Sequence, residues 1–301
     1  MMSYREQAVS FPVAGDLALG IAALPELTAE LTAELTEPPG DCGVLIAVGG
    51  PQYRVGSHRQ FLLLSRRLAA EGFPVFRFDY RGMGDSDGAM RSFEDVSEDI
   101  AAAVDTFRQT CPGIRRVVLW GLCDAASAIL MYLHATRDSR IDGVVLLNPW
   151  VRSEASLAQT HIKHYYGQRL LQREFWMKLF SGKMRVFHSL RELLSTARKA
   201  RQSSGNKAEH FSSFQDRMAD GLRRFKGDVL LILSGDDYTA REFLEYSTAH
   251  PMWSELIQAA NVCRLDVQGA DHTFSTQELR TRVEDETLRW LRSRHARPLQ
   301  E

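Results

Sequence analysis

The sequence predicts an α/β fold in which a mostly parallel, doubly wound sheet is covered by helices on both faces. Continuous runs of Val, Ile and Leu, typical of strands buried on both faces, contribute to segments 42–50, 74–80, 115–120, 142–150, 228–235 and 261–269. Apolar residues at intervals of three and four between most of these segments indicate amphipathic helices. Alternation of strands with helices favours right-handed crossovers, which place the carboxyl ends of the strands along one edge. We expect any active site at that edge.

The first 37 residues depart from this alternation. Segments 6–13 and 16–24 alternate in hydrophobicity on either side of Ala14 and Gly15, which predicts an antiparallel pair of strands. The repeat ELTAELTAELTE at 26–37 places its leucines along one helical stripe. We expect this repeat to be an insertion packed on the surface.

Two predicted helices are preceded by residues with the spacing of helix caps. Ser57 and Gln60 have the spacing of a capping box ahead of the amphipathic segment 61–72. Ser92 and Asp95 precede a second segment with helical periodicity. Both pairs are expected to begin helices.

Residues 151–222 contain long helical patterns and no convincing strand, which predicts a helical cap inserted into a core formed by 1–150 and 223–301. The cap interval holds 13 lysines and arginines against 6 aspartates and glutamates, a net charge of +7. Such an excess is usual on solvated helix surfaces. The alternative is that it attracts an anionic substrate, such as a coenzyme A or carrier-protein thioester or an acidic polysaccharide precursor.

The composition is that of an ordinary globular protein with one large core: 301 residues, 44% hydrophobic and 25% charged, with a net charge of -1. No apolar signal segment or membrane-spanning run is apparent, so a cytoplasmic location is expected. The four widely spaced cysteines predict neither a disulfide framework nor a zinc cluster. His161 and His164 lack a nearby third ligand, and no nucleic-acid motif occurs. We therefore expect no metal, no cofactor and no nucleic-acid partner.

The segment GLCDAA, residues 121–126, places Cys123 at a sharp turn between a strand and a helix. This turn has the form that holds a catalytic nucleophile, which is flanked by small residues because the strained backbone leaves no room for large ones. A helix N-terminus favours the thiolate form of Cys123, whereas the neighbouring Asp124 carboxylate disfavours a second negative charge, so a base is expected nearby. The alternative is that Cys123 is a small buried hydrophobic residue.

Two later strand ends supply the partners of a nucleophilic cysteine. His272 follows the last predicted strand, in GADHTF, and is the expected general base. The strand before it ends in Gly-Asp-Asp, where the turn pattern favours Asp237 over Asp236 as the residue that orients the histidine. Along the chain, the three residues follow one another in the order Cys123, Asp237 and His272.

The motifs together resemble those of the α/β-hydrolase superfamily, over nearly the whole chain. FDYRGMGDSDG at 78–88 resembles the segment that follows the fourth strand in that superfamily, and GLCDAA and GADHTF follow in the expected order. The use of cysteine is similar to that of the dienelactone hydrolases. GGPQYRVGSHRQF at 49–61 further resembles the exosortase A system-associated hydrolase type 1 family. That resemblance implies a setting among bacterial exopolysaccharide and protein-sorting functions.

The loop that should supply an oxyanion hole departs from the superfamily pattern. It reads Gly49-Gly50-Pro51-Gln52, and proline has no N–H to donate. The residue after the nucleophile, Asp124, is expected to supply one donor through its backbone. The second is expected from Gln52, through its backbone or its side-chain amide.

These residues predict a hydrolase that cleaves an ester or thioester through an acyl-cysteine intermediate. Residues expected to line the substrate site are Gly50, Tyr53, Trp150 and Tyr165. Transfer of the acyl group to another acceptor, such as a sugar hydroxyl, uses the same residues and stays open. A non-catalytic scaffold that binds a ligand or a partner protein is the other alternative, and the oligomeric state is left open.

Overall fold

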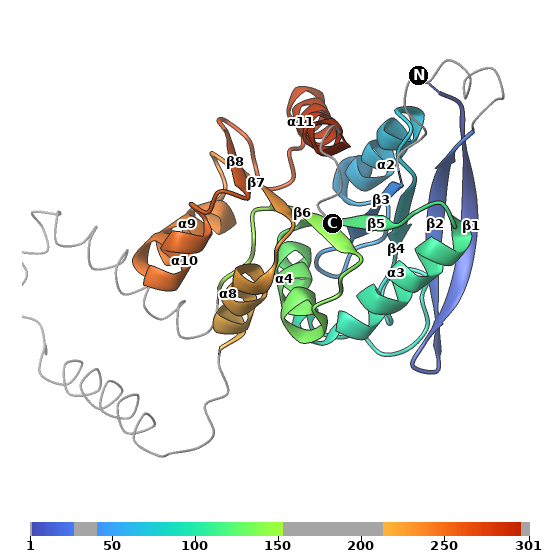
Figure 1. Cartoon of the computed structure of the whole chain (residues 1–301), viewed down its shortest axis with the longest axis horizontal. Coiled ribbons are helices and arrows are strands. Elements are labelled where there is room, and N and C mark those ends of the chain that lie inside the picture. Colours follow the sequence, from blue (N-terminus) through green and yellow to red (C-terminus); the bar gives the residue numbers. More distant parts are fainter. Residues whose placement is uncertain (1, 27–40, 153–212, 296–301) are drawn as a thin grey trace, which may run out of the picture. The chain divides into compact units, whose positions relative to one another are not determined.

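The computed structural model describes residues 2–26, 41–152 and 213–295. Within these residues the chain forms one eight-stranded sheet with the order β1-β2-β4-β3-β5-β6-β7-β8 (Figure 1). The strands are β1 Tyr4–Val13, β2 Asp16–Pro25, β3 Cys42–Ala47, β4 Val75–Phe78, β5 Arg116–Leu122, β6 Ile141–Leu147, β7 Asp228–Ser234 and β8 Val262–Val267.

The first two strands form the predicted antiparallel pair, and the other strands run parallel. Strand β1 pairs antiparallel with β2, around a turn in which Ala14 and Gly15 have φ angles of 48° and 96°. Strand β2 then pairs antiparallel with β4. From β4 to β8 every pairing is parallel, so the carboxyl ends of these strands lie along one edge of the sheet.

Helices cover both faces of the sheet, as the sequence predicts. The α-helices are α2 Gln60–Ala70, α3 Ser97–Thr110, α4 Asp124–Thr136, α8 Phe214–Arg224, α9 Tyr238–Ala249, α10 Pro251–Leu256 and α11 Gln277–His295. Helices α2 and α11 lie on one side of the sheet and α3, α4 and α8 on the other (Figure 1). Two buried apolar clusters, one on each face, hold these layers together.

The predicted capping box at Ser57 and Gln60 is wrong. Ser57–Arg59 forms its own 3-10 turn, and the next helix begins at Gln60 without a side-chain cap. The physical cause is a left-handed backbone at His58 and Arg59, with φ angles of 53° and 63°, which breaks the spacing of the box. The Ser57 hydroxyl instead donates to the side-chain oxygen of Gln52, 3.3 Å away.

The second predicted cap begins a shorter element than expected. The Ser92 hydroxyl accepts a hydrogen bond from the backbone N–H of Glu94, 3.3 Å away, and so caps the 3-10 turn Phe93–Asp95. Helix α3 itself begins only at Ser97. Ser92 therefore caps an element, but the long helix starts one turn later.

The predicted cap interval, 151–222, includes most of helix α8. The chain divides into two compact units, one formed by 1–151 with 214–301 and the other by 152–213. Helix α8 belongs to the first unit and packs closely on α4, since a Cβ atom added at Gly221 would lie 2.2 Å from the carbonyl oxygen of Leu130. Residues 153–212 and most of the 26–37 repeat lie outside the described residues, so the cap and the insertion stay predictions.

Buried charges hold the loop that follows β4. The guanidinium group of Arg81, 1% exposed, donates hydrogen bonds to the buried carboxylate of Asp99 at 2.8, 3.1 and 3.2 Å. Beside it, the carboxylate of Asp79 accepts the backbone N–H of Arg54 at 2.6 Å and also pairs with the Arg54 guanidinium group. Removing one member of such a buried pair costs about 3–5 kcal/mol, so these pairs fix the residue between them, Tyr80.

Candidate active site

Cys123 lies at the sharp turn between β5 and α4. Its backbone is in the left-handed region, with φ 62° and ψ -126°, a conformation that costs on the order of 1–3 kcal/mol in a non-glycine residue. Its N–H donates to the carbonyl of Leu147 at 2.8 Å, and its own carbonyl accepts the N–H of Ala126 at 3.1 Å and of Trp150 at 3.3 Å. These bonds anchor the strained residue to β6 and to the first turn of α4.

Small residues around Cys123 make this turn possible. A Cβ atom added at Gly121 would lie 2.8 Å from the Cδ1 atom of Ile129 and 2.9 Å from the carbonyl carbon of Ala125. Only glycine therefore fits at 121, because real Cβ atoms do not approach other atoms so closely. The side chain of Cys123 is left partly exposed at the carboxyl end of the sheet.

The structure brings His272 and Asp237 together. The Nδ1 atom of His272 lies 2.9 Å from Oδ2 of Asp237, which also accepts the N–H of Ala240 at 3.0 Å and so caps α9. Burial alone would raise the pKa of Asp237, but the hydrogen bond from His272 and the backbone donors of α9 hold it below its ordinary value. Asp236 is exposed and lies 3.5 Å from the guanidinium of Arg241, away from the imidazole.

The imidazole of His272 also interacts with the side chain of Cys123. The hydrogen bond with Asp237, followed by a side-chain hydrogen bond with Cys123, raises the pKa of His272 to about 10, against the opposing effect of burial. The three side chains come from the ends of β5, β7 and β8, and all lie at the carboxyl edge of the sheet. The sulfur, imidazole and carboxylate therefore form a connected series.

Asn148, which the sequence reading missed, ties the histidine loop to the sheet. It is fully buried with φ 44°, and its amide donates to the Ser234 hydroxyl at 2.9 Å and to the carbonyl of His272 at 3.2 Å. Its own oxygen accepts the N–H of Ser234 at 2.9 Å, and the Ser234 hydroxyl donates to the carbonyl of Asp271 at 2.9 Å. The available signal is a lone asparagine directly after the apolar run of the segment 142–150.

In the oxyanion loop, one of the two predicted donors of Gln52 already has a partner. The backbone N–H of Gln52 donates to the carbonyl of Gly50 at 2.7 Å, so this N–H is already engaged. The side-chain amide of Gln52 is the alternative that remains, since its Nε2 atom lies 3.9 Å from a Cβ atom built on Gly50. The hydrogen bond from Ser57 to the Gln52 side-chain oxygen orients that amide.

The side chain of Asp124 occupies this loop, which the sequence reading did not predict. Its Oδ1 atom accepts the N–H of Gly50 at 2.6 Å. A Cβ atom added at Gly49 would lie 2.5 Å from the same oxygen and 2.4 Å from the carbonyl of Leu122, so glycine is required there. Burial raises the pKa of Asp124, opposed by the N–H groups of Gly50 and Ala125. A partly buried carboxyl group therefore engages the backbone N–H of Gly50.

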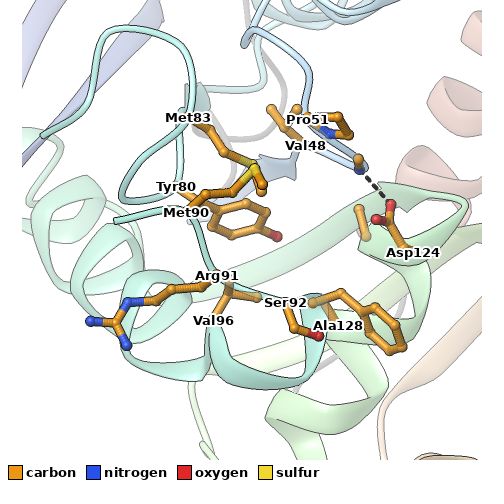
Figure 2. A pocket seen from close by; sticks show the side chains of 13 residues that line it. Val48, Pro51, Tyr80, Met83, Met90, Arg91, Ser92, Val96, Asp124 and Ala128 are labelled. Atoms are coloured by element: carbon orange, nitrogen blue, oxygen red, sulfur yellow. Dashed lines mark hydrogen bonds between the residues drawn. The ribbon is translucent and has the colours of Figure 1, made fainter. Parts of the chain in front are cut away.

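A cavity of about 220 Å³ lies beside Asp124 (Figure 2). We call it the Asp124 pocket; it is lined by Val48, Gly50, Pro51, Tyr80, Met83, Met90, Arg91, Ser92, Phe93, Val96, Asp124, Ala125 and Ala128. All of these residues belong to the core unit.

Of the residues predicted to bind substrate, Gly50 lines this pocket. Tyr53 does not line it; its ring is 43% exposed and lies 4.3 Å from the guanidinium carbon of Arg54. Trp150 is half-buried and its carbonyl accepts the hydroxyl of Ser127 at 2.7 Å, outside the pocket lining. Tyr165 lies outside the described residues.

The part of the chain that the structure describes lacks two further features. No group of three or more His, Cys, Asp and Glu side chains is placed to hold a metal ion there. No helix among the same residues has the length and apolar character needed to cross a membrane.

Comparisons with known proteins agree on the fold. The model of a family described as the alpha/beta hydrolase family matches residues 44–286. A solved esterase of Pyrococcus furiosus has a TM-score of 0.59 and 18% identity, covering 97% of this chain and 91% of its own. Est1E from Butyrivibrio proteoclasticus, solved with ferulic acid bound, has a TM-score of 0.59 and 13% identity, covering 96% of this chain and 100% of its own. A comparison with curated proteins gave no match.

Proposed function

Because the chain belongs to the alpha/beta hydrolase family, we propose that it hydrolyses a carboxylic ester or thioester with Cys123 as nucleophile. The observation that supports this most strongly is the connected series of sulfur, imidazole and carboxylate at the carboxyl edge of the sheet. Esterases among the structural neighbours agree with this reaction class. An ester carbonyl is the electrophile that such a series attacks.

The proposed reaction proceeds in two steps. The proton of the Cys123 thiol is held on His272, whose pKa of about 10 keeps the imidazole charged at neutral pH, and Asp237 stabilises this charge through Nδ1. The Cys123 sulfur then attacks the substrate carbonyl carbon. His272 then gives this proton to the departing alcohol or thiol, which leaves an acyl-cysteine. In the second step water attacks the same carbon, His272 takes a proton from it, and the Cys123 sulfur leaves as the acid is released.

The negative charge that develops on the carbonyl oxygen needs donors. The backbone N–H of Asp124 and the side-chain amide of Gln52 are the proposed donors, since Pro51 has no N–H and the N–H of Gly50 is bound to the Asp124 carboxyl group. This arrangement makes the Gln52 side chain part of the catalytic machinery.

Two alternatives use the same site. An acyltransferase would pass the acyl group from Cys123 to a hydroxyl of another molecule, and adding such an acceptor would divert product from the free acid. A binding protein without catalysis is favoured by one observation, the hydrogen bond by which Asp124 occupies the N–H of Gly50. Release of the leaving group, with and without an added acceptor, separates the hydrolase, the acyltransferase and the binding protein.

Several finer predictions belong to this proposal. They are a helical cap within 151–222, an anionic substrate, a cytoplasmic location, and a role in exopolysaccharide or protein-sorting metabolism. The basic interval supports the anionic substrate. If it attracts the substrate, kcat/KM falls steeply between low and moderate salt, and a flat salt profile would remove this part.

Cysteine labelling with matched variants tests the nucleophile. Iodoacetamide should modify both Cys123 and the exposed Cys263, and a short acyl thioester should protect only Cys123. Release of thiol or p-nitrophenol from short acyl substrates should be lost in Cys123→Ala and kept in Cys263→Ala. Equal activity in these two variants would refute the proposal.

A further inference from the structure

The Asp124 pocket combines apolar walls with a buried hydroxyl. Methionine, valine, phenylalanine and alanine side chains form most of its lining. Tyr80 is 3% exposed, and its hydroxyl makes no hydrogen bond within the described residues. Burying an unpaired hydroxyl costs on the order of 1–3 kcal/mol. The Tyr80 hydroxyl is therefore available to donate and accept a hydrogen bond.

The unpaired hydroxyl faces the side of the pocket formed by Asp124. Figure 2 shows the phenol of Tyr80 extending into the pocket with its oxygen toward the Asp124 side. Burial, and then the negative charge of Asp124, raises the pKa of Tyr80 well above its ordinary value, so the phenol keeps its proton and remains a donor. Asp124 presents a partly buried carboxyl group whose Oδ1 atom accepts the N–H of Gly50.

These two groups select the chemistry of an occupant. A hydroxyl group can accept a hydrogen bond from the Tyr80 phenol and donate one to the Asp124 carboxylate. A methyl group in the same place would leave the phenol without a partner. The pocket therefore discriminates between a hydroxylated and a plain carbon chain.

The position and volume of the pocket define which part of a substrate fits. Asp124 directly follows Cys123 in the chain, and Gly50 belongs to the oxyanion loop, so two of the lining residues adjoin the proposed reaction centre. An engineered cavity of about 150 Å³ holds benzene, so a cavity of about 220 Å³ suits a group of roughly six to eight non-hydrogen atoms.

We propose that the Asp124 pocket binds the acyl part of the substrate and selects a short hydroxyacyl group by hydrogen bonds to Tyr80 and Asp124. This inference rests on the proposed function and adds the substrate class. It makes Tyr80 a specificity-determining residue.

A set of thioesters with one leaving group tests the proposal. Butanoyl, 2-hydroxybutanoyl, 3-hydroxybutanoyl and 4-hydroxybutanoyl thioesters of N-acetylcysteamine differ only in the hydroxyl. We expect the kcat/KM of one hydroxylated thioester to exceed that of the butanoyl thioester by about tenfold, the worth of one or two hydrogen bonds. A wild-type protein without such a preference would overturn the proposal.

Tyr80→Phe isolates the phenol hydroxyl. Because that hydroxyl has no partner among the described residues, its removal should leave the melting temperature unchanged or higher. The variant should lose the preference for the hydroxylated thioester, measured as the ratio of its kcat/KM to that of the butanoyl thioester. Tyr246→Phe, which removes a hydroxyl outside the pocket, should keep the preference. A Tyr80→Phe protein that retains the preference would refute the role of Tyr80.

Binding measurements separate this proposal from the proposed function. Cys123→Ala should bind the preferred intact hydroxyacyl thioester about tenfold more tightly than the butanoyl thioester, by calorimetry, and Tyr80→Phe in that background should abolish the difference. If this difference appears while the wild-type protein hydrolyses none of the thioesters, the pocket stands and the proposed hydrolysis fails. If hydrolysis occurs while binding shows no difference, the hydroxyacyl proposal fails alone.

Discussion

The two halves of the candidate active site are built in opposite ways. On one half, Asp237 and His272 are held by a helix cap, a 2.9 Å hydrogen bond and the buried amide of Asn148. On the other half, the oxyanion loop contains a proline, and a carboxylate takes the N–H of Gly50. The first half has the hydrogen bonds that orient an imidazole, whereas in the proposed function the second half replaces one of its two backbone donors with the side-chain amide of Gln52. Substrate choice is therefore expected to depend on the second half.

The largest predicted effect tests the half that holds the histidine. Asp237→Asn should lower kcat by about 10⁴-fold, because an amide cannot hold the imidazole in the required tautomer or stabilise its charged form. Asp236→Asn is the matched control, since this exposed neighbour does not contact the imidazole and should keep kcat within about twofold. Steady-state hydrolysis of a short thioester measures both variants, and similar activities would contradict the assignment.

The next effect tests the oxyanion half. Gln52→Met keeps the size of the side chain but removes its amide, and should lower kcat about 100-fold with a small change in KM. Ser57→Ala removes only the hydrogen bond that orients this amide, so a loss of about threefold to tenfold is expected. Unchanged kcat in Gln52→Met would show that the oxyanion donor lies elsewhere.

A smaller effect tests how the sheet positions the histidine. Asn148→Leu should lower kcat by about tenfold and the free energy of unfolding by about 1–3 kcal/mol, because the carbonyl of His272 and the N–H of Ser234 lose a buried partner. Asn261→Leu is the control at the opposite end of β7, where the amide donates to the carbonyl of Gly227 at 2.8 Å. It should lower stability without lowering kcat. Urea unfolding and steady-state kinetics measure the two quantities, and equal kcat losses would contradict a positioning role.

The smallest predicted effect is a pH dependence of stability. The folded-state pKa of His272 is raised to about 10, chiefly by Asp237, above the model-peptide value of 6.5. The stabilisation from this pair is therefore fully present below about pH 6.5 and disappears as pH rises through about 10. Urea unfolding of the wild type and Asp237→Asn should give a stability difference at pH 6 that shrinks by pH 10.5. A difference that grows with pH would contradict the sign.

Much of the architecture and of the histidine half could be predicted from the sequence. The apolar segments give the strands because a strand buried on both faces has no room for polar side chains. Cys123, Asp237 and His272 each follow such a strand, and parallel strands bring their carboxyl ends to one edge. Turn geometry and chain order then distinguish these residues from other cysteines, aspartates and histidines.

The oxyanion half could not be predicted in the same detail, because its arrangement depends on backbone conformation and packing. Non-glycine residues with positive φ, His58 and Arg59, break the expected capping box, and no residue type marks them in advance. The side chain of Asp124, at the start of α4, lies close to Gly49, which belongs to a loop far away in the sequence. The unpaired hydroxyl of Tyr80 likewise follows from packing around the Asp124 pocket and not from a local pattern.

The identity of the covalent intermediate tests the central claim most directly. Brief mixing of the protein with an excess of a thioester substrate, followed by acid quenching and peptide mass spectrometry, should reveal an acyl group on the peptide that contains Cys123. His272→Ala should abolish this adduct during the same mixing time, because the thiol loses its base. Hydrolysis by the wild type with the acyl group found on another residue, or formation of the adduct at an unchanged rate in His272→Ala, would contradict the account.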